Sequence, residues 1–439
     1  MAKGVFRVFG QPKMAALLFL GFSSGLPFIL TNDVLKAWLA VEKIDLATIG
    51  LFSLVALPYS FKWAWSPLVD RYIPPLFGRR RGWIFIMQVL LLVAIAAMGF
   101  NDPSNALRLL SINAFLVAFF SATQDVAIDA YRTDVLEERE MGAGASVFVL
   151  GYRIALLVSG AFAFMLADRL SWPVVYIAMA LLMLPGMIAT WRAPEPVLLD
   201  KPPQTLLDAV VLPFRDFFQR AGLFLGVAVL LFIILFKLPD YLGASMRAPF
   251  LIQTGFSETE IGAILGGIGL GATIVGALFG GVVVAKLGIN RSLWIFGLLQ
   301  AASNLMYYFQ AQIGKNNGFL VVTMVVENFC TGLVTAGFVA FMMSLCSVRF
   351  SATQYALLSS LMSASRDIVV APFGKVAESV GWSNYFLITL AVALPGLLLL
   401  PLFAPWNRES PLLAARHTGE TVSAEEATRL AHKAGREEA

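Results

Sequence analysis

The sequence predicts an all-α polytopic membrane protein whose twelve transmembrane helices form two six-helix bundles. Three observations predict this class. Of the 439 residues, 58% are hydrophobic and only 14% are charged, whereas a soluble domain carries about 25% charged residues. Apolar runs long enough to cross a bilayer, at about 20 residues each, return along the whole chain. Features of the first half also repeat in the second half at a constant spacing.

The apolar runs place the helices in order. The first half is expected to form helices at about 13–40, 46–69, 83–101, 105–134, 141–168 and 172–192. The second half is expected to form helices at about 222–252, 257–285, 290–311, 318–348, 351–379 and 382–404. The predicted domains are therefore an N-terminal bundle (1–192), a cytoplasmic linker (193–221), a C-terminal bundle (222–404) and a polar cytoplasmic tail (405–439). Within the linker, residues 203–220 have the pattern of an amphipathic helix at the membrane surface.

The basic residues in the loops predict the orientation. With both termini in the cytoplasm, 21 Lys and Arg residues fall in cytoplasmic segments and 6 fall on the opposite side. Positive residues concentrate on the cytoplasmic side of membrane proteins. The sequence therefore predicts a multi-pass protein of the bacterial inner membrane with an even number of helices and both termini inside.

Paired motifs predict that the two halves share one geometry. Leu-Pro at 26–27 and Ile-Gly at 49–50 return at 238–239 and 261–262, an offset of 212 at every position. A Trp and a Leu-Pro-Gly near the end of each half repeat in the same way, at an offset of 210. Pro and Gly disturb membrane helices, so their shared placement indicates shared structure. Parallel six-helix repeats are the plan of the major facilitator fold.

The polar residues exclude several classes of protein. Both cysteines, Cys330 and Cys346, lie in one apolar stretch, and both histidines, His417 and His432, lie in the polar tail. This arrangement offers no metal site and no histidine proton relay. No phosphate-binding Gly-rich loop ending in Lys-Ser/Thr is present, which excludes an ATP-driven pump on this chain. A net charge of +4 does not indicate nucleic-acid binding. We expect no cofactor and no enzymatic activity.

The segment after the second predicted helix carries candidate gating residues. It contains Asp70 and Arg71, followed by Gly78 and three arginines at 79–81. This pattern resembles the loop motif of the major facilitator superfamily, with an insertion at 72–77. Such charges can pair with helix ends in one conformation and separate in the other. We therefore assign gating to Asp70, Arg71 and Arg79, and also to Arg132; the alternative is simple anchoring at the cytoplasmic surface.

Asp125 and Asp129 are the candidate proton-coupling residues. Together with Arg132 they lie on one face of the fourth predicted helix, because spacings of four and three bring side chains together. Ionisable groups at membrane depth are costly and commonly functional. Asp125 is expected nearest to the middle of the membrane, where a carboxylate can take up and release a proton near neutral pH. The alternatives are permanent structural pairs, for Asp125 with a neighbouring cation and for Asp129 with Arg132.

Four cations at membrane depth are the candidate substrate contacts: Arg153, Arg366, Lys62 and Lys237. Cations facing a water-filled cavity would bind an anionic solute, and the arginines would offer a two-pronged contact to carboxylate or phosphate. The alternative is internal pairing with buried carboxylates, for which the candidates are Asp33, Asp240, Glu327 and Asp367. The sequence alone leaves both possibilities open.

Longer motifs resemble one transporter family. GFSSGLP at 21–27, FSATQDVAIDAYR at 120–132 and DAVVLPFRDFF at 208–218 are similar to stretches of the AmpG muropeptide permease family, most strongly over residues 14–220. The resemblance implies a monomeric, proton-driven importer in the lipid bilayer. Its implied cargo is N-acetylglucosaminyl-1,6-anhydro-N-acetylmuramyl peptides, taken up for peptidoglycan recycling and, in some bacteria, linked to β-lactamase induction. It also implies functional positions at Ala122, Gln124, Asp125, Asp129 and Gly25.

Three other functions remain possible at this point. A related carrier of acetyl-CoA would use the same cations for its anionic cargo. A membrane-embedded enzyme is opposed by the lack of a metal cluster or a nucleophile–base pair in the sequence. A sensor or scaffold without transport is opposed by the charges at membrane depth.

Overall fold

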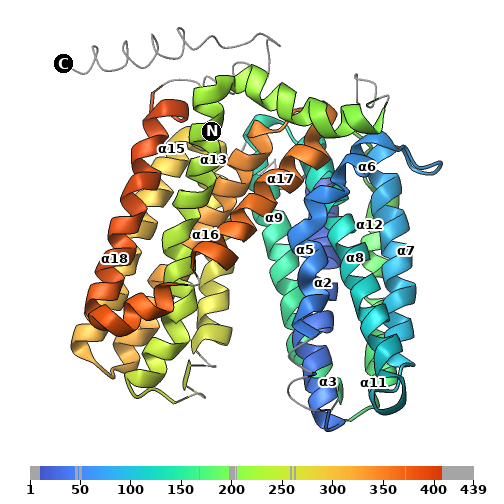
Figure 1. The fold of residues 1–439 in the computed structure, drawn as a ribbon, viewed down its shortest axis with the longest axis horizontal. Helices are drawn as coiled ribbons and strands as arrows, with labels where there is room; N and C mark the ends of the chain where they lie inside the picture. The colour runs from blue at the N-terminus through green and yellow to red at the C-terminus, as the bar shows by residue number, and fades with distance from the viewer. Residues whose placement is uncertain are drawn as a thin grey trace. The chain divides into compact units, whose positions relative to one another are not determined.

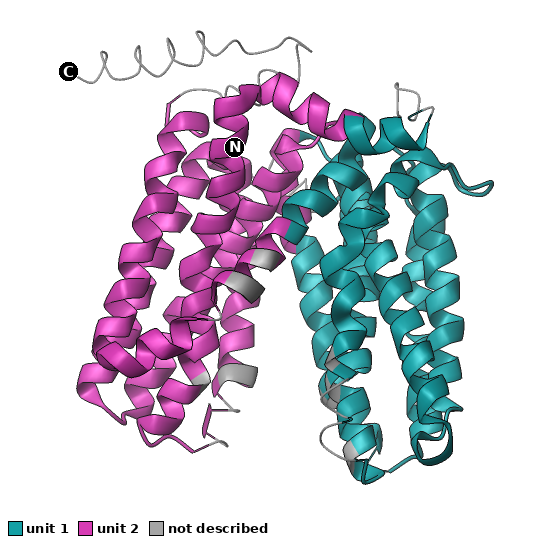
Figure 2. Ribbon diagram, viewed as in Figure 1, with its two compact units in different colours: residues 1–137, 147–211, 348–360 teal, residues 138–146, 212–347, 361–439 magenta. Residues whose placement is uncertain are grey.

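The computed structural model describes residues 10–44, 48, 52–167, 169–196, 203, 205–257, 260–261, 264–370 and 372–407. The predicted polar tail therefore lies almost wholly outside the described residues. Every regular element within them is a helix, which confirms the all-α prediction. The chain forms two compact units, coloured separately in Figure 2. Unit 1 contains residues 1–137, 147–211 and 348–360, and unit 2 contains residues 138–146, 212–347 and 361–439.

Unit 1 takes most of the first half of the chain. Many of its helices are labelled in Figure 1. Its elements are α2 (Pro12–Ile29), η1 (Leu30–Val34), α3 (Leu35–Val41), η2 (Phe52–Ala56), α5 (Leu57–Phe61), η3 (Lys62–Ala64), α6 (Ser66–Arg71), α7 (Arg79–Gly99), α8 (Pro103–Val135), α9 (Glu138–Leu157), η4 (Val158–Phe162), α10 (Ala163–Ala167), α11 (Trp172–Leu181) and α12 (Leu184–Arg192). Residues 138–146 of α9 belong to unit 2.

Prolines explain why the predicted helix at 46–69 is divided. Pro58 lies in the first turn of α5 and Pro67 in the first turn of α6. A proline lacks the N–H that a continuing helix needs, but fits the first turn of a new one. The described part of this span is therefore a series of short helical pieces, and not the single helix that the sequence predicted.

Glycines bring α2 and α9 into backbone contact within unit 1. A Cβ added at Gly21 would lie 2.2 Å from the carbonyl oxygen of Phe148, and one added at Gly151 would lie 1.9 Å from that of Leu18. Only glycine allows so close an approach of two membrane helices. These contacts position the polar residues that follow Gly21 on α2 and Gly151 on α9.

Unit 2 takes most of the second half. Its elements are α13 (Leu206–Gln253), η5 (Ile264–Gly269), α15 (Leu270–Ile313), α16 (Asn317–Leu345), η7 (Ser365–Val369) and α18 (Phe373–Phe403). Residues 206–211 of α13 belong to unit 1. Two further elements, η6 (Val348–Phe350) and the start of α17 (Ser351–Ala364), lie in unit 1. Rings of Phe232, Phe236, Phe338 and Phe403 pack together in the core of unit 2.

Single glycines end the long helices where the sequence predicted connections. Gly222 in α13, Gly288 in α15 and Gly381 in α18 have φ angles of 72°, 79° and 76°. These left-handed values interrupt a helix and favour glycine. The predicted amphipathic segment is helical from Leu206 and ends at Gly222. Its apolar side chains Leu207 and Val211 are largely exposed.

The described residues contain nine helices that are long and apolar enough to cross a membrane. One of them, Gly267–Ile313, covers two predicted spans that meet at Gly288. The predicted spans at 46–69 and 351–379 are made of shorter pieces and are not among the nine. The count is thus consistent with twelve predicted spans, and the protein is a multi-pass membrane protein.

Candidate functional site

Asp70 binds the N-terminus of α17. This side chain, at the end of α6, is fully buried. Its Oδ1 accepts from the backbone N–H of Ala352 at 3.3 Å, and its Oδ2 accepts from the backbone N–H of Thr353 at 2.7 Å. The first N–H groups of a helix have no partner within the helix and carry a partial positive charge. A carboxylate at this place accepts hydrogen bonds from these N–H groups and balances their partial positive charge.

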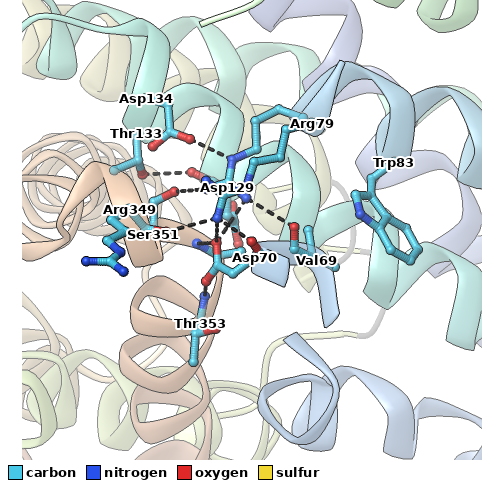
Figure 3. Close-up of polar contacts among 12 residues, drawn as sticks. Val69, Asp70, Arg79, Trp83, Asp129, Thr133, Asp134, Arg349, Ser351 and Thr353 are labelled. Atoms are coloured by element: carbon cyan, nitrogen blue, oxygen red, sulfur yellow. Dashed lines mark hydrogen bonds and ion pairs between the residues drawn. The ribbon is translucent and has the colours of Figure 1, made fainter. Parts of the chain in front are cut away.

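Two arginines at the start of α7 complete this buried network (Figure 3). Arg80 Nη1 lies 3.0 Å from Asp70 Oδ1, and its Nε donates to Asp134 Oδ2 at 2.6 Å. Its Nη2 donates to Ser351 Oγ at 2.7 Å. Arg79 donates to the backbone carbonyls of Asp70 and Arg349. We call Asp70, Arg79, Arg80, Asp134 and residues 349–353 the α17 latch. It ties residues 349–353 to α6, α7 and α8.

The α17 latch includes two of the four predicted gating residues. Asp70 and Arg79 are members. Arg71 is half-buried and stacks over Tyr72, 5.1 Å from the ring centre, and no ion pair joins it to another described residue. Sequence reasoning left out Arg80 and Asp134, although Arg80 is the fully buried member. A run of three arginines in the sequence does not show which of them is buried beside a carboxylate and which lies at the surface.

Asp129 is the centre of a second buried cluster. Its Oδ1 lies 2.8 Å from Arg132 Nη2, and its Oδ2 lies 3.3 Å from Lys62 Nζ. The guanidinium of Arg132 is held between the rings of Phe148 and Tyr355, at 4.6 and 4.9 Å from the ring centres, and donates to the Tyr355 hydroxyl. Two cations therefore hold this one carboxylate in place. In this conformation Asp129 is a structural partner of Lys62 and Arg132.

Asp125 has a different environment from Asp129, one turn away on α8. Its Oδ1 accepts a hydrogen bond from the Ser24 hydroxyl of α2 at 2.6 Å, and its side chain is partly exposed. Among the described residues no cation forms an ion pair with it. The neighbouring Gln124 is fully buried, and neither of its amide atoms has a hydrogen-bond partner in the described structure. Asp125 thus lies outside the described ion pairs, although it shares its helix face with Asp129.

Gly25 lies beside this cluster as a packing residue. A Cβ added there would lie 2.7 Å from the backbone oxygen of Tyr152 and 3.0 Å from Ala155 Cβ on α9. The structure thus gives Gly25 a close contact between α2 and α9. A side chain at this position would push α2, which carries Ser24, away from α9, which carries Arg153.

The structure places the four predicted cations in different surroundings. Lys62 pairs with Asp129, and Lys237 on α13 lies 2.6 Å from Asp240 Oδ2. Arg153 on α9 is partly buried and has neither an ion pair nor a hydrogen bond to another described side chain. Arg366 is exposed and lies in η7, a π-helical segment. π-Helical turns are frequent at functional sites.

Unit 2 contains an ion pair that sequence reasoning missed. Arg247 lies within α13, where its Nη2 is 3.0 Å from Glu327 Oε1 on α16. The signal was present, since Glu327 lies in a long apolar stretch that needs a countercharge. Of the described residues, no group of three or more His, Cys, Asp and Glu could hold a metal ion.

Comparison with known proteins agrees with this architecture. The model of the Major Facilitator Superfamily matches residues 14–366. The anhydromuropeptide permease of Escherichia coli K12 is 50% identical over 402 residues, covering 91% of this chain and 81% of that protein. A Rickettsia felis protein described as putative transporter AmpG 4 is 31% identical over 404 residues, covering 90% of this chain and 97% of that protein.

A solved structure has the same fold. The proton:xylose symporter XylE of this superfamily gives a TM-score of 0.66 at 12% identity, with 94% of this chain and 99% of that chain covered. At such low identity the match speaks for the fold alone. The family match and the relatives place the protein among transporters. The chain belongs to the major facilitator superfamily and, within it, to the AmpG-type muropeptide permease family.

Proposed function

We propose that this protein imports N-acetylglucosaminyl-1,6-anhydro-N-acetylmuramyl peptides from the periplasm to the cytoplasm by proton symport. The observation that carries the proposal is the 50% identity to the Escherichia coli anhydromuropeptide permease over 91% of this chain. The protein acts as a monomer in the inner membrane, with both termini in the cytoplasm. Bundles at 1–192 and 222–404, joined by the linker at 193–221, carry the transport.

Asp125 is the proton-coupling residue in this proposal. Of the two predicted carboxylates, Asp129 is held by Arg132 and Lys62, whereas Asp125 accepts one hydrogen bond from Ser24. A carboxylate held in two buried ion pairs would have to give them up to become neutral, whereas one outside the described ion pairs can bind a proton without that loss. Asp129 contributes by holding Lys62 and Arg132 one turn away.

Arg153 is the substrate contact that its surroundings support best. The peptide of the cargo ends in carboxylates, and a guanidinium forms two parallel hydrogen bonds to such a group. A guanidinium without an internal partner can accept the cargo without first breaking an ion pair. Arg366, Gln124 and Gly25 complete the proposed cargo contacts. Lys62 and Lys237 would first have to leave Asp129 and Asp240.

The α17 latch is the proposed gate. Asp70, Arg79 and Arg80 are buried and mutually paired, so opening the latch breaks several charge-assisted bonds together. Such a group has two defined states, closed and open, and few stable intermediates. Arg132, which donates to Tyr355 on α17, would open and close with the latch. Arg71 would pair in the open state.

Uptake into membrane vesicles tests the proposal. Labelled anhydromuropeptide should accumulate in right-side-out vesicles containing the protein, and a protonophore should stop accumulation above the outside concentration. An excess of unlabelled muropeptide should compete, whereas acetyl-CoA should not. Competition by acetyl-CoA alone would assign the protein to the other anionic cargo. Accumulation that the protonophore leaves intact would remove proton coupling.

A further inference from the structure

Gln300 on α15 is a buried side chain with unusual surroundings. It is 4% exposed, and among the described residues neither its Oε1 nor its Nε2 has a hydrogen-bond partner. An amide has one acceptor and two donor positions, and burying them unpaired is unfavourable. An internal water can supply the hydrogen bonds that a buried amide of this kind lacks.

A small cavity lies beside Gln300. Its volume is about 10 Å³, and its lining includes Gln300, Asp240, Phe236, Pro239 and Leu397. This is about the space that one water molecule needs. Asp240 is 7% exposed, and its Oδ1 also lacks a partner in the described structure, while its Oδ2 binds Lys237. Pro239 has no N–H, so the carbonyl of Leu235 loses its usual donor in α13.

The first half of the chain shows how the equivalent glutamine is satisfied. Gln88 lies 212 positions before Gln300, the offset that relates the Leu-Pro motifs of the two halves. Gln88 Oε1 accepts from the Thr190 hydroxyl at 2.8 Å, and its Nε2 donates to Ser23 Oγ at 3.4 Å. The positions that correspond to these partners in the second half hold Leu235, at offset 212, and Leu400, at offset 210. Unit 2 thus keeps the amide and replaces both hydroxyl partners by leucine.

We propose that unit 2 contains an internal water site, with one water bound between the amide of Gln300 and Oδ1 of Asp240. The water replaces the two hydroxyl groups that serve Gln88. It also gives Asp240 a second hydrogen bond beside that of Lys237. A metal cation is excluded as the occupant because Lys237 Nζ lies only 2.6 Å from the same carboxylate. The cavity is also too small for a sugar ring or a peptide group.

X-ray radiolytic labelling tests the site directly in the purified protein. Hydroxyl radicals formed from a bound water oxidise the side chains next to it. Phe236 lines the cavity, so mass spectrometry should detect its oxidation in the wild-type protein, well above that of Phe386, which is buried elsewhere in unit 2. Gln300→Leu should reduce the oxidation of Phe236 to the level of Phe386. Equal labelling of the two rings in the wild type, or labelling of Phe236 that Gln300→Leu leaves unchanged, would overturn the proposal.

Thermal unfolding supplies a second test. A site that holds a water and a dry site predict opposite changes in the melting temperature of Gln300→Leu. If a water binds Gln300, Gln300→Leu removes the hydrogen bonds between the amide and the water. The melting temperature should then fall, as it should for Gln88→Leu in unit 1. If the amide is buried in a dry cavity, Gln300→Leu removes an unsatisfied group and should raise the melting temperature. An increase would therefore contradict the water site. If a variant fails to fold, the comparison of Phe236 with Phe386 in the wild-type protein still tests the proposal.

Discussion

The two units treat buried charge differently. In unit 2 each described ion pair joins one cation to one carboxylate, as in Lys237 with Asp240 and Arg247 with Glu327. In unit 1 charges are gathered into the α17 latch and the Asp129 cluster, and Asp125 and Arg153 stand outside any described ion pair. Separating a matched buried pair leaves two uncompensated charges and is costly. The difference suggests that unit 2 is the more fixed of the two and that unit 1 carries the groups free to change partners.

Asp125→Asn should give the largest effect and would break this comparison most directly. The amide keeps the shape of the side chain and can still accept from Ser24, but it cannot take up a proton. Accumulation of labelled cargo in vesicles should fall to the level of vesicles without the protein, whereas exchange of cargo at equal concentrations should continue. Glu378→Gln, at an exposed position of unit 2, is the matched control. Normal accumulation by Asp125→Asn would place proton coupling elsewhere.

Asp70→Asn tests whether the α17 latch is a stable closed state. The change leaves Arg80 and Arg79 without their shared carboxylate, and removing one partner of a buried ion pair costs about 3–5 kcal/mol. The melting temperature of the detergent-solubilised protein should fall accordingly, and uptake should fall with it. Asp208→Asn, on an exposed turn of α13, should change neither. A variant of unchanged stability would show that the latch contributes little.

Arg153→Ala and Lys237→Met should separate cargo contacts from structural pairs. Loss of a charge-assisted hydrogen bond costs about 1.5–3 kcal/mol, so Arg153→Ala should raise the half-saturation concentration for uptake by about tenfold or more, with the melting temperature unchanged. Lys237→Met should instead lower the melting temperature, because Asp240 is left unpaired, and the double variant Lys237→Met/Asp240→Leu should recover it. A raised half-saturation concentration in Lys237→Met with full stability would return Lys237 to the cargo site.

The sequence predicted the fold because membrane helices are encoded locally. Apolar length, loop charge and the Leu-Pro and Leu-Pro-Gly motifs are read along the chain, and each of Gly222, Gly288 and Gly381 falls where a connection was expected. The division of the span at 46–69 was not predicted, although Pro58 and Pro67 are the residues that cause it.

The candidate site could be predicted only in part, because its pairing depends on contacts distant in sequence. Asp125 and Asp129 share a helix face and differ by one turn, yet only Asp129 meets Lys62, which lies 67 positions earlier. Asp70 meets the backbone of Thr353, 283 positions later, through N–H groups that every residue carries. No residue type marks such a contact in the sequence.

The smallest expected effect concerns the caps of two equivalent helices, α8 in unit 1 and α16 in unit 2. Asp102 accepts from the backbone N–H of Ser104 at 2.9 Å, and Asn316 accepts from that of Phe319 at 3.0 Å. The hydrogen bond from Ser104 lowers the pKa of Asp102 below its ordinary value. Its stabilisation is therefore present above the ordinary pKa and is lost as the pH falls through the lowered value.

Asn316 does not titrate, so only the cap of unit 1 depends on pH. Asp102→Asn should leave the melting temperature nearly unchanged at pH 7 and make it slightly less sensitive to acid below about pH 4; Asn316→Asp should make it slightly more sensitive. Equal acid sensitivity of both variants and the wild type would show that neither cap contributes measurably.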